Sequence, residues 1–112
     1  MKSVMISGQL NILTEQREEN SFNRFFIIMT CKRKIEPPVK VYVYCDEIKK
    51  VIGEFICDEV FYLHHYLDEP GLIRMGWVVT NEKSYDGHFK NLKEFTNKEP
   101  PKTWYYVDEE NK

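Results

Sequence analysis

The sequence has too few cysteines, in the wrong arrangement, for a disulfide framework or a zinc site. Its three cysteines, Cys31, Cys45 and Cys57, are an odd number with no CxxC pair, so neither arrangement is expected. Each falls in or beside an apolar run, and we interpret all three as small core residues. Glycine and proline number only five each, against 14% aromatic residues, which argues against global disorder.

Long apolar stretches are also missing. No run approaches the roughly 20 residues that a membrane helix requires, and polar residues follow Met1 too soon for a signal peptide. We therefore expect a cytoplasmic protein without membrane association. A chain of 112 residues suits one domain that buries its core without metal or disulfides.

Motifs of catalysis are absent from the sequence. It has no Gly-rich phosphate loop, nucleophile elbow or His-x-x-x-His motif. His64 and His65 are adjacent, so on a strand they would point to opposite faces and could not chelate one ion together. The carboxylate pairs at Asp58–Glu59 and Asp68–Glu69 fall at strand ends or turns, and we interpret them as solvated charges. We expect no enzyme, cofactor or metal site.

The charge is nearly balanced but unevenly distributed. A formal net charge of −2 disfavours nucleic-acid binding, whose usual footprint is a basic surface. However, the bases gather at 32–40 and 83–102, while the acids gather at 15–19, 46–59 and 108–110. A local basic patch matters more for binding than the total charge.

The clearest strand signal in the chain is Val39–Cys45. Its residues alternate, and successive strand side chains point to opposite faces. One face carries only small apolar residues and is predicted to join the core: Val39, Val41, Val43 and Cys45. The other face carries Lys40, Tyr42 and Tyr44, a cation and two aromatics that suit base stacking and phosphate neutralisation.

Hydrophobic periodicity predicts the remaining elements. In chain order they are a strand over 4–13, a strand over 22–32, a short helix over 46–55, a hairpin of 59–67 with 72–80, a helix over 84–97 and an aromatic run over 103–107. Arg24 and Lys32 at the ends of the second strand favour its Arg24–Phe26–Ile28–Thr30–Lys32 side as an open face.

This order of elements predicts a mainly β fold, a five-stranded OB-fold Greek-key barrel with a short helix between strands three and four. An SH3-like barrel or an α+β meander would give a similar order. Residues 1–82 would form the barrel. Residues 83–112 would form a C-terminal helix and aromatic tail, packed on or extending from the same domain.

Four segments carry a resemblance to a known family: Ile6–Leu10, Asn23–Ile28, Val39–Cys45 and Gly76–Val79. On these residues the chain resembles OB-fold single-stranded DNA-binding proteins of bacterial, phage or mobile-element type. The resemblance implies sequence-tolerant binding of single-stranded DNA in DNA replication or recombination, by a homo-oligomer. RNA is the other nucleic acid that such a face suits.

The predicted nucleic-acid site lies on strands two and three. Bases would stack on Phe26, Tyr42 and Tyr44. Phosphates would be neutralised by five cations, and two further residues would extend the groove: Arg24, Lys32, Arg33, Lys34 and Lys40, with His64 and Trp104.

Alternatives remain for each part of this prediction. The tyrosines could be ordinary cross-strand partners, with Phe26 in a second small core. Trp104–Tyr106 could be a docked strand, a contact for a protein partner or a second copy, or an extra stacking platform. The rival function is a small β-barrel protein-interaction module, or a phage or mobile-element inhibitor acting on a protein.

Overall fold

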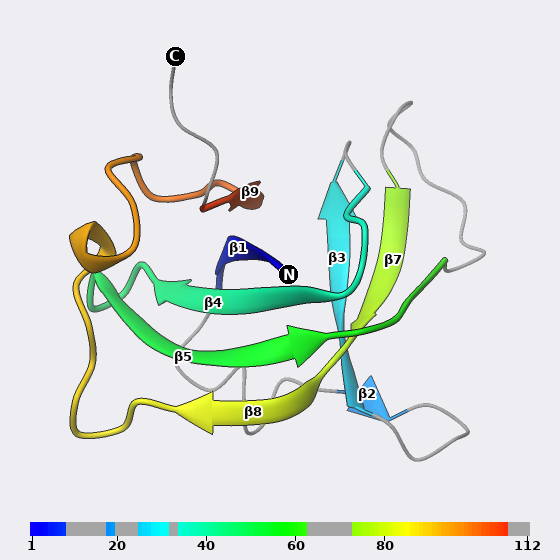
Figure 1. Cartoon of the computed structure of the whole chain (residues 1–112), viewed down its shortest axis with the longest axis horizontal. Helices are drawn as coiled ribbons and strands as arrows, with labels where there is room; N and C mark the ends of the chain where they lie inside the picture. The colour runs from blue at the N-terminus through cyan, green and yellow to red at the C-terminus, as the bar shows by residue number, and fades with distance from the viewer. Residues whose placement is uncertain (9–17, 20–24, 32–33, 63–72, 108–112) are drawn as a thin grey trace.

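The computed structural model describes residues 1–8, 18–19, 25–31, 34–62 and 73–107. Within these ranges the chain is mainly β, as predicted, and its strands form two sheets (Figure 1). The strands are β1 (Lys2–Ser7), β2 (Glu18–Glu19), β3 (Phe25–Cys31), β4 (Val39–Cys45), β5 (Lys50–Cys57), β6 (Val60–Tyr62), β7 (Ile73–Val78), β8 (Thr80–Ser84) and β9 (Trp104–Tyr106), with one 3-10 turn, η1 (Leu92–Glu94). None of the helical structure in these ranges is long and apolar enough to cross a membrane.

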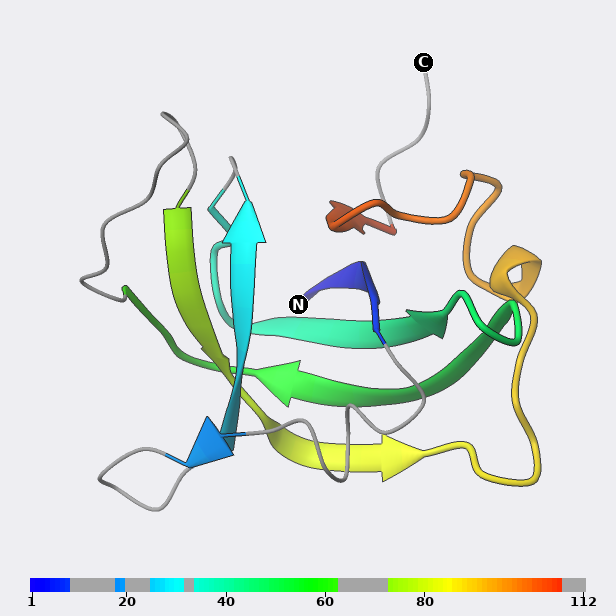
Figure 2. The same ribbon diagram turned by 180° about the vertical axis from the view of Figure 1, so that it is seen from behind.

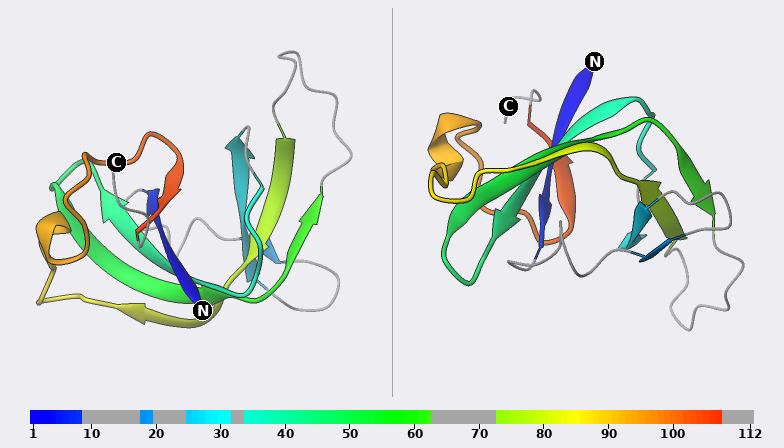
Figure 3. Two further views of the ribbon diagram at one scale, coloured as in Figure 1. Left: turned by 45° about the horizontal axis from the view of Figure 1, so that its top comes forward. Right: turned by 90° about the horizontal axis from the view of Figure 1, so that it is seen from below.

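Sheet A has the order β8-β5-β4-β1-β9 and sheet B the order β2-β3-β7-β6. The strands of sheet B run across one end of the strongly bent sheet A (Figures 2 and 3). Val79 separates β7 from β8, so one continuous stretch of chain passes from sheet B into sheet A. The strand predicted over 72–80 is therefore two strands in two sheets.

The main core lies between the two sheets. The predicted apolar face of β4 is confirmed, because Val39, Val41, Val43 and Cys45 are all 0% exposed and belong to this core. Sheet B contributes Met75 and Trp77, both fully buried. Trp104 of β9 packs edge-on against Trp77, with ring centroids 5.8 Å apart, so the interpretation of Trp104–Tyr106 as a docked strand is confirmed.

The helix predicted over 46–55 is wrong. Residues 46–49 form a turn, and β5 pairs antiparallel with β4 from Lys50 onward. A bulge lies where Val43 pairs with Gly53 and Tyr44 with Val51, leaving Ile52 as the extra residue. Val51 then faces one side of the sheet and Ile52 the other, and both are buried. Two adjacent apolar residues at this position give the sequence the i, i+3, i+4, i+7 spacing of apolar residues that is typical of a helix.

The other predicted elements are found in part within the described residues. The helix predicted over 84–97 is wrong except for η1. The hairpin of 59–67 with 72–80 survives as β6 paired with β7, and its residues 63–72 lie outside the described residues. The first two predicted strands appear as β1, which pairs in parallel with β4, and as β3. The described residues show no OB-type helix between the third strand and this hairpin.

Candidate nucleic-acid interface

The candidate site is the outer face of sheet A, the face turned away from sheet B. One row of paired residues crosses all five strands on this face: Tyr105, Met5, Tyr42, Glu54 and Lys83. A second apolar cluster forms here around Met5, Tyr44, Val51 and Tyr85. The central strands of sheet A are therefore buried on both faces.

Residues 85–107, which we call the C-terminal segment, cover part of this face. The segment leaves β8, passes the end of sheet A where β4 turns into β5, and returns as β9 beside β1 (Figure 2). Backbone hydrogen bonds fasten it: Lys90 N donates to Val51 O at 3.0 Å, and Val51 N donates to Lys90 O at 2.7 Å. Phe95 then lies on Tyr42, with ring centroids 4.5 Å apart.

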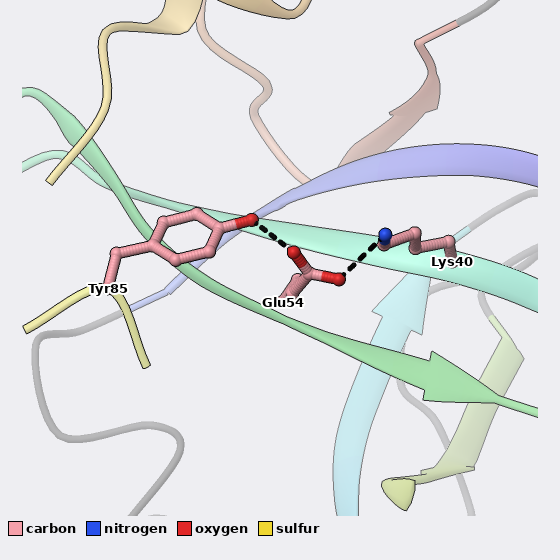
Figure 4. A network of polar contacts seen from close by, with 3 residues as sticks. All are labelled: Lys40, Glu54 and Tyr85. Atoms are coloured by element: carbon pink, nitrogen blue, oxygen red, sulfur yellow. Dashed lines mark hydrogen bonds and ion pairs between the residues drawn. The ribbon is translucent and has the colours of Figure 1, made fainter. Parts of the chain in front are cut away.

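A polar network links the C-terminal segment to β4 and β5 (Figure 4). The Tyr85 hydroxyl donates to Glu54 Oε1 at 2.6 Å, and Lys40 Nζ lies 2.8 Å from Glu54 Oε2. The hydrogen bond with Glu54 raises the pKa of Lys40. Burial alone would raise the pKa of Glu54, but hydrogen bonds from Lys40 and Tyr85 lower it below 4.5. Burial and Glu54 together raise the pKa of Tyr85. Near neutral pH, Lys40 is a cation, Glu54 an anion and Tyr85 a donor.

Lysines and aromatic rings alternate over the outer face. Lys40 Nζ lies 5.6 Å from the Tyr42 ring centroid, Lys90 Nζ lies 4.6 Å from that of Tyr85, and Lys98 Nζ lies 4.9 Å from that of Tyr105. These are cation–π distances. Tyr42 and Tyr105 are partly exposed, so ring surface and positive charge are presented together.

A cleft of about 430 Å³ opens where the C-terminal segment meets the β4–β5 turn. It is lined by Lys49, Asn91, Leu92, Lys93, Asn97, Lys98, Glu99 and Pro100. Lys98 Nζ donates to Tyr106 O at 2.8 Å. The Asn91 side chain accepts a hydrogen bond from Lys50 Nζ, and its backbone N–H donates to Glu94 Oε2 at 2.7 Å. The cleft walls are therefore held in place by defined contacts.

The structure brings three predicted site residues together on one face. Lys40, Tyr42 and Tyr44 share the outer face of β4, as the alternation predicted. The prediction that this face is open is wrong for Tyr44, which is only 4% exposed because the C-terminal segment covers it. Tyr42 lies under Phe95 and is partly exposed.

Phe26 is not part of this face. It lies in sheet B, is 7% exposed and makes an edge contact with Phe61 at 4.9 Å between ring centroids. The prediction of an exposed Phe26 is therefore wrong. Its ring packs against Phe61 within sheet B, and its placement in a second small core stays a prediction.

The remaining predicted residues lie elsewhere. Lys34 is exposed and lies over the Tyr62 ring at 5.2 Å. Trp104 is 6% exposed within the main core, so it offers no open stacking surface. The other four lie outside the described residues: Arg24, Lys32, Arg33 and His64.

Sequence reasoning missed four residues that complete the face, namely Glu54, Tyr85, Lys90 and Phe95. Tyr105 was considered only as part of the aromatic run Trp104–Tyr106. Glu54 could have been found if residues 50–57 had been predicted as a strand, because Phe55 would then enter the core and its neighbour Glu54 would point to the opposite face. For Phe95 no local signal exists, because its contact with Tyr42 joins segments more than 50 residues apart. Among the described residues, no three His, Cys, Asp or Glu side chains gather in a way that could hold a metal ion.

Comparison with known proteins adds a fold likeness. No family model matches the chain, and no curated protein matches it. The chain is similar in structure to a crystal structure of a point mutant of the ZmASCH protein from Zymomonas mobilis. The TM-score is 0.62 at 12% sequence identity, covering 95% of this chain and 90% of the other. At this identity the likeness shows the fold alone.

Proposed function

We propose that this protein binds single-stranded nucleic acid, in the first instance DNA, on the outer face of sheet A and without strong sequence preference. The observation that carries the proposal is the alternation of lysines with aromatic rings on this one face. Single-strand binders combine these two features, a positive groove for the backbone and rings on which bases stack.

The charge of the face supports binding of a polyanion. Lys40 of β4, Lys83 of β8 and three lysines of the C-terminal segment, Lys90, Lys93 and Lys98, gather on the outer face or beside its cleft. Glu54 offsets part of this charge but is already engaged by Lys40 and Tyr85. A strand crossing the face would displace counterions, so binding should weaken steeply with salt.

The stacking surface differs from the one that the sequence predicted. Tyr44 is covered, whereas Tyr42, Phe95 and Tyr105 are partly exposed. We propose these three rings as the base platform. Each stacked base would contribute about 1–3 kcal/mol and would tolerate any sequence. A role in DNA replication or recombination belongs to the same proposal and rests on the resemblance noted above. The proposed binding by this face does not require an OB-type arrangement of strands.

The test is fluorescence anisotropy with a labelled oligo-dT of about 30 nucleotides, at about 50 and 200 mM salt. The variant K40Q/K90Q removes two lysines of the face. The matched control K34Q removes one exposed lysine outside the face. We expect salt-sensitive binding by the wild type and by K34Q, and a salt slope shallower by about 2 for the double variant.

Two outcomes would contradict the proposal. Absence of binding at the lower salt would refute the function and favour a protein partner, whose apolar interface would be far less sensitive to salt. If K34Q weakened binding more than K40Q/K90Q did, the binding site would lie near Lys34 at the end of sheet B and not on the outer face of sheet A.

A further inference from the structure

The row of paired residues that crosses the outer face of sheet A contains one carboxylate, that of Glu54. Its side chain is 18% exposed, so part of it is open to a ligand on this face. A carboxylate repels phosphates, but Lys40 and Lys83 flank it from the neighbouring strands and outweigh its charge. Glu54 is therefore placed to contact a part of the nucleic acid other than its phosphates.

Two contacts fix the orientation of this carboxylate (Figure 4). Lys40 Nζ lies 2.8 Å from Glu54 Oε2, and the Tyr85 hydroxyl donates to Glu54 Oε1 at 2.6 Å. Burial alone would raise the pKa of Glu54, but these hydrogen bonds lower it, so the group is an anion near neutral pH. Each carboxylate oxygen has about two acceptor positions, and the two contacts use one position at each oxygen. A pair of donors on a ligand would engage the second positions.

Tyr42 lies beside Glu54 on the same face of the sheet. The two residues are directly opposite each other in the β4–β5 pairing, and the Cβ atoms of such a pair are about 4.5–5.5 Å apart. The Tyr42 ring is partly exposed and belongs to the proposed base platform. A base that stacks on Tyr42 would therefore bring its hydrogen-bonding edge next to the Glu54 carboxylate.

The DNA bases differ in what their edges offer to a carboxylate. Guanine presents two adjacent donors, N1–H and the N2 amino group, which match the two oxygens of a carboxylate. Adenine and cytosine present one amino group each. Thymine presents one N–H between two carbonyl oxygens, and these oxygens repel a carboxylate. Hydrogen bonds to an ionised acceptor are roughly twice as strong as neutral ones, so guanine gains most from this position.

From this geometry we propose that Glu54 reads the base stacked on Tyr42 and favours guanine over thymine there. The inference rests on the proposed function, because the rest of the outer face would hold the strand by stacking and charge. Only the nucleotide on Tyr42 is read, so binding stays sequence-tolerant elsewhere along the strand. Tyr85 and Lys40 act as positioning residues that orient the carboxylate.

The experiment measures by fluorescence anisotropy how well unlabelled strands compete with a labelled oligo-dT for the protein. The competitors are oligo-dT of about ten nucleotides and the same strand with one central guanine, adenine or cytosine. A sequence-tolerant face lets the strand slide, so the single guanine reaches Tyr42. We expect the wild type to bind the guanine strand about tenfold tighter than oligo-dT, with the adenine and cytosine strands in between.

Two glutamine variants test the role of the carboxylate. E54Q keeps the size of the side chain and removes its charge, so the preference for guanine should fall to about twofold or less, while binding of oligo-dT is unchanged or tighter. E47Q removes one exposed carboxylate of the β4–β5 turn and should keep the full preference. If E54Q weakened the binding of all strands by the same factor, Glu54 would act only through the fold, which would overturn the inference.

The wild type alone separates this inference from the proposed function, whether or not E54Q is stable. Equal binding of the guanine strand and oligo-dT would refute the inference and leave the function standing. A preference for adenine or cytosine over guanine would do the same. Absence of binding by every strand would refute the function and the inference with it.

Discussion

Replacing Tyr85 by Phe tests whether the polar network fastens the C-terminal segment to sheet A. Tyr85 is 6% exposed, and its hydroxyl donates to the ionised Glu54 at 2.6 Å. Hydrogen bonds to charged groups contribute about 1.5–3 kcal/mol. Because the Glu54 side chain is 18% exposed and keeps Lys40 as a partner, we expect Y85F to lower the free energy of unfolding by about 1–2 kcal/mol.

Two matched variants set the scale for this loss. The Tyr105 hydroxyl donates to a neutral acceptor, Glu99 O, at 2.8 Å in an exposed setting, so Y105F should cost about 0.5–1 kcal/mol. The Lys40 side chain is 37% exposed, and solvent screens its attraction to Glu54. We therefore expect K40Q to cost about 0.2–1 kcal/mol.

Urea unfolding of the three variants and the wild type measures this ranking directly. Y85F should have the lowest midpoint, with an unchanged dependence on urea. The reasoning would be refuted if Y85F cost no more than Y105F, because the hydrogen bond to Glu54 would then add nothing beyond an exposed one. It would also be refuted if K40Q were the most destabilised.

Three further changes test other parts of the structure. An added Cβ at Gly76 would lie 2.4 Å from Phe61 Cζ, so G76A should cost about 1–3 kcal/mol in urea unfolding, and F61L in the same chain should recover part of it. W104A should cost about 3–5 kcal/mol, because Trp104 packs in the main core. The pKa of Glu54 is lowered below 4.5, so its contribution to stability is present above that pH and is lost as pH falls through the folded-state pKa. Below about pH 4.5 the wild type should therefore lose stability more steeply than E54Q in unfolding series at different pH values.

The part of the fold that the sequence predicts best is β4. Strict alternation over Val39–Cys45 specifies both the strand and the face that enters the core, because burial on one side requires a period of two. The same alternation places Lys40 and Tyr42 together on the opposite face. Local pattern is sufficient where one side of a strand is purely apolar.

β5 shows where local pattern fails. Val51 and Ile52 are both buried, on opposite faces, because a bulge shifts the register beside Gly53. Consecutive apolar residues followed by Phe55 imitate one side of a helix. The sequence carries no sign that both faces of this strand are covered.

Which side chains of the candidate site are exposed depends on contacts between residues far apart in the sequence, and no short stretch of sequence contains both partners. The C-terminal segment covers Tyr44 and lays Phe95 on Tyr42, although its own pattern predicted a helix. Phe26 likewise found its partner, Phe61, on another strand. The residue types of the face were predictable, whereas their exposure was decided by tertiary packing.

The most direct test of the central claim is an amide NMR titration of the whole chain with unlabelled oligo-dT. If the outer face of sheet A binds the strand, the perturbed amides should cluster at Lys40–Tyr42 and across the C-terminal segment, near Lys90, Phe95 and Lys98. Perturbations confined to the surroundings of Lys34 and Tyr62 would place the strand on the other end of the molecule. Such a result, or an unchanged spectrum, would contradict the account.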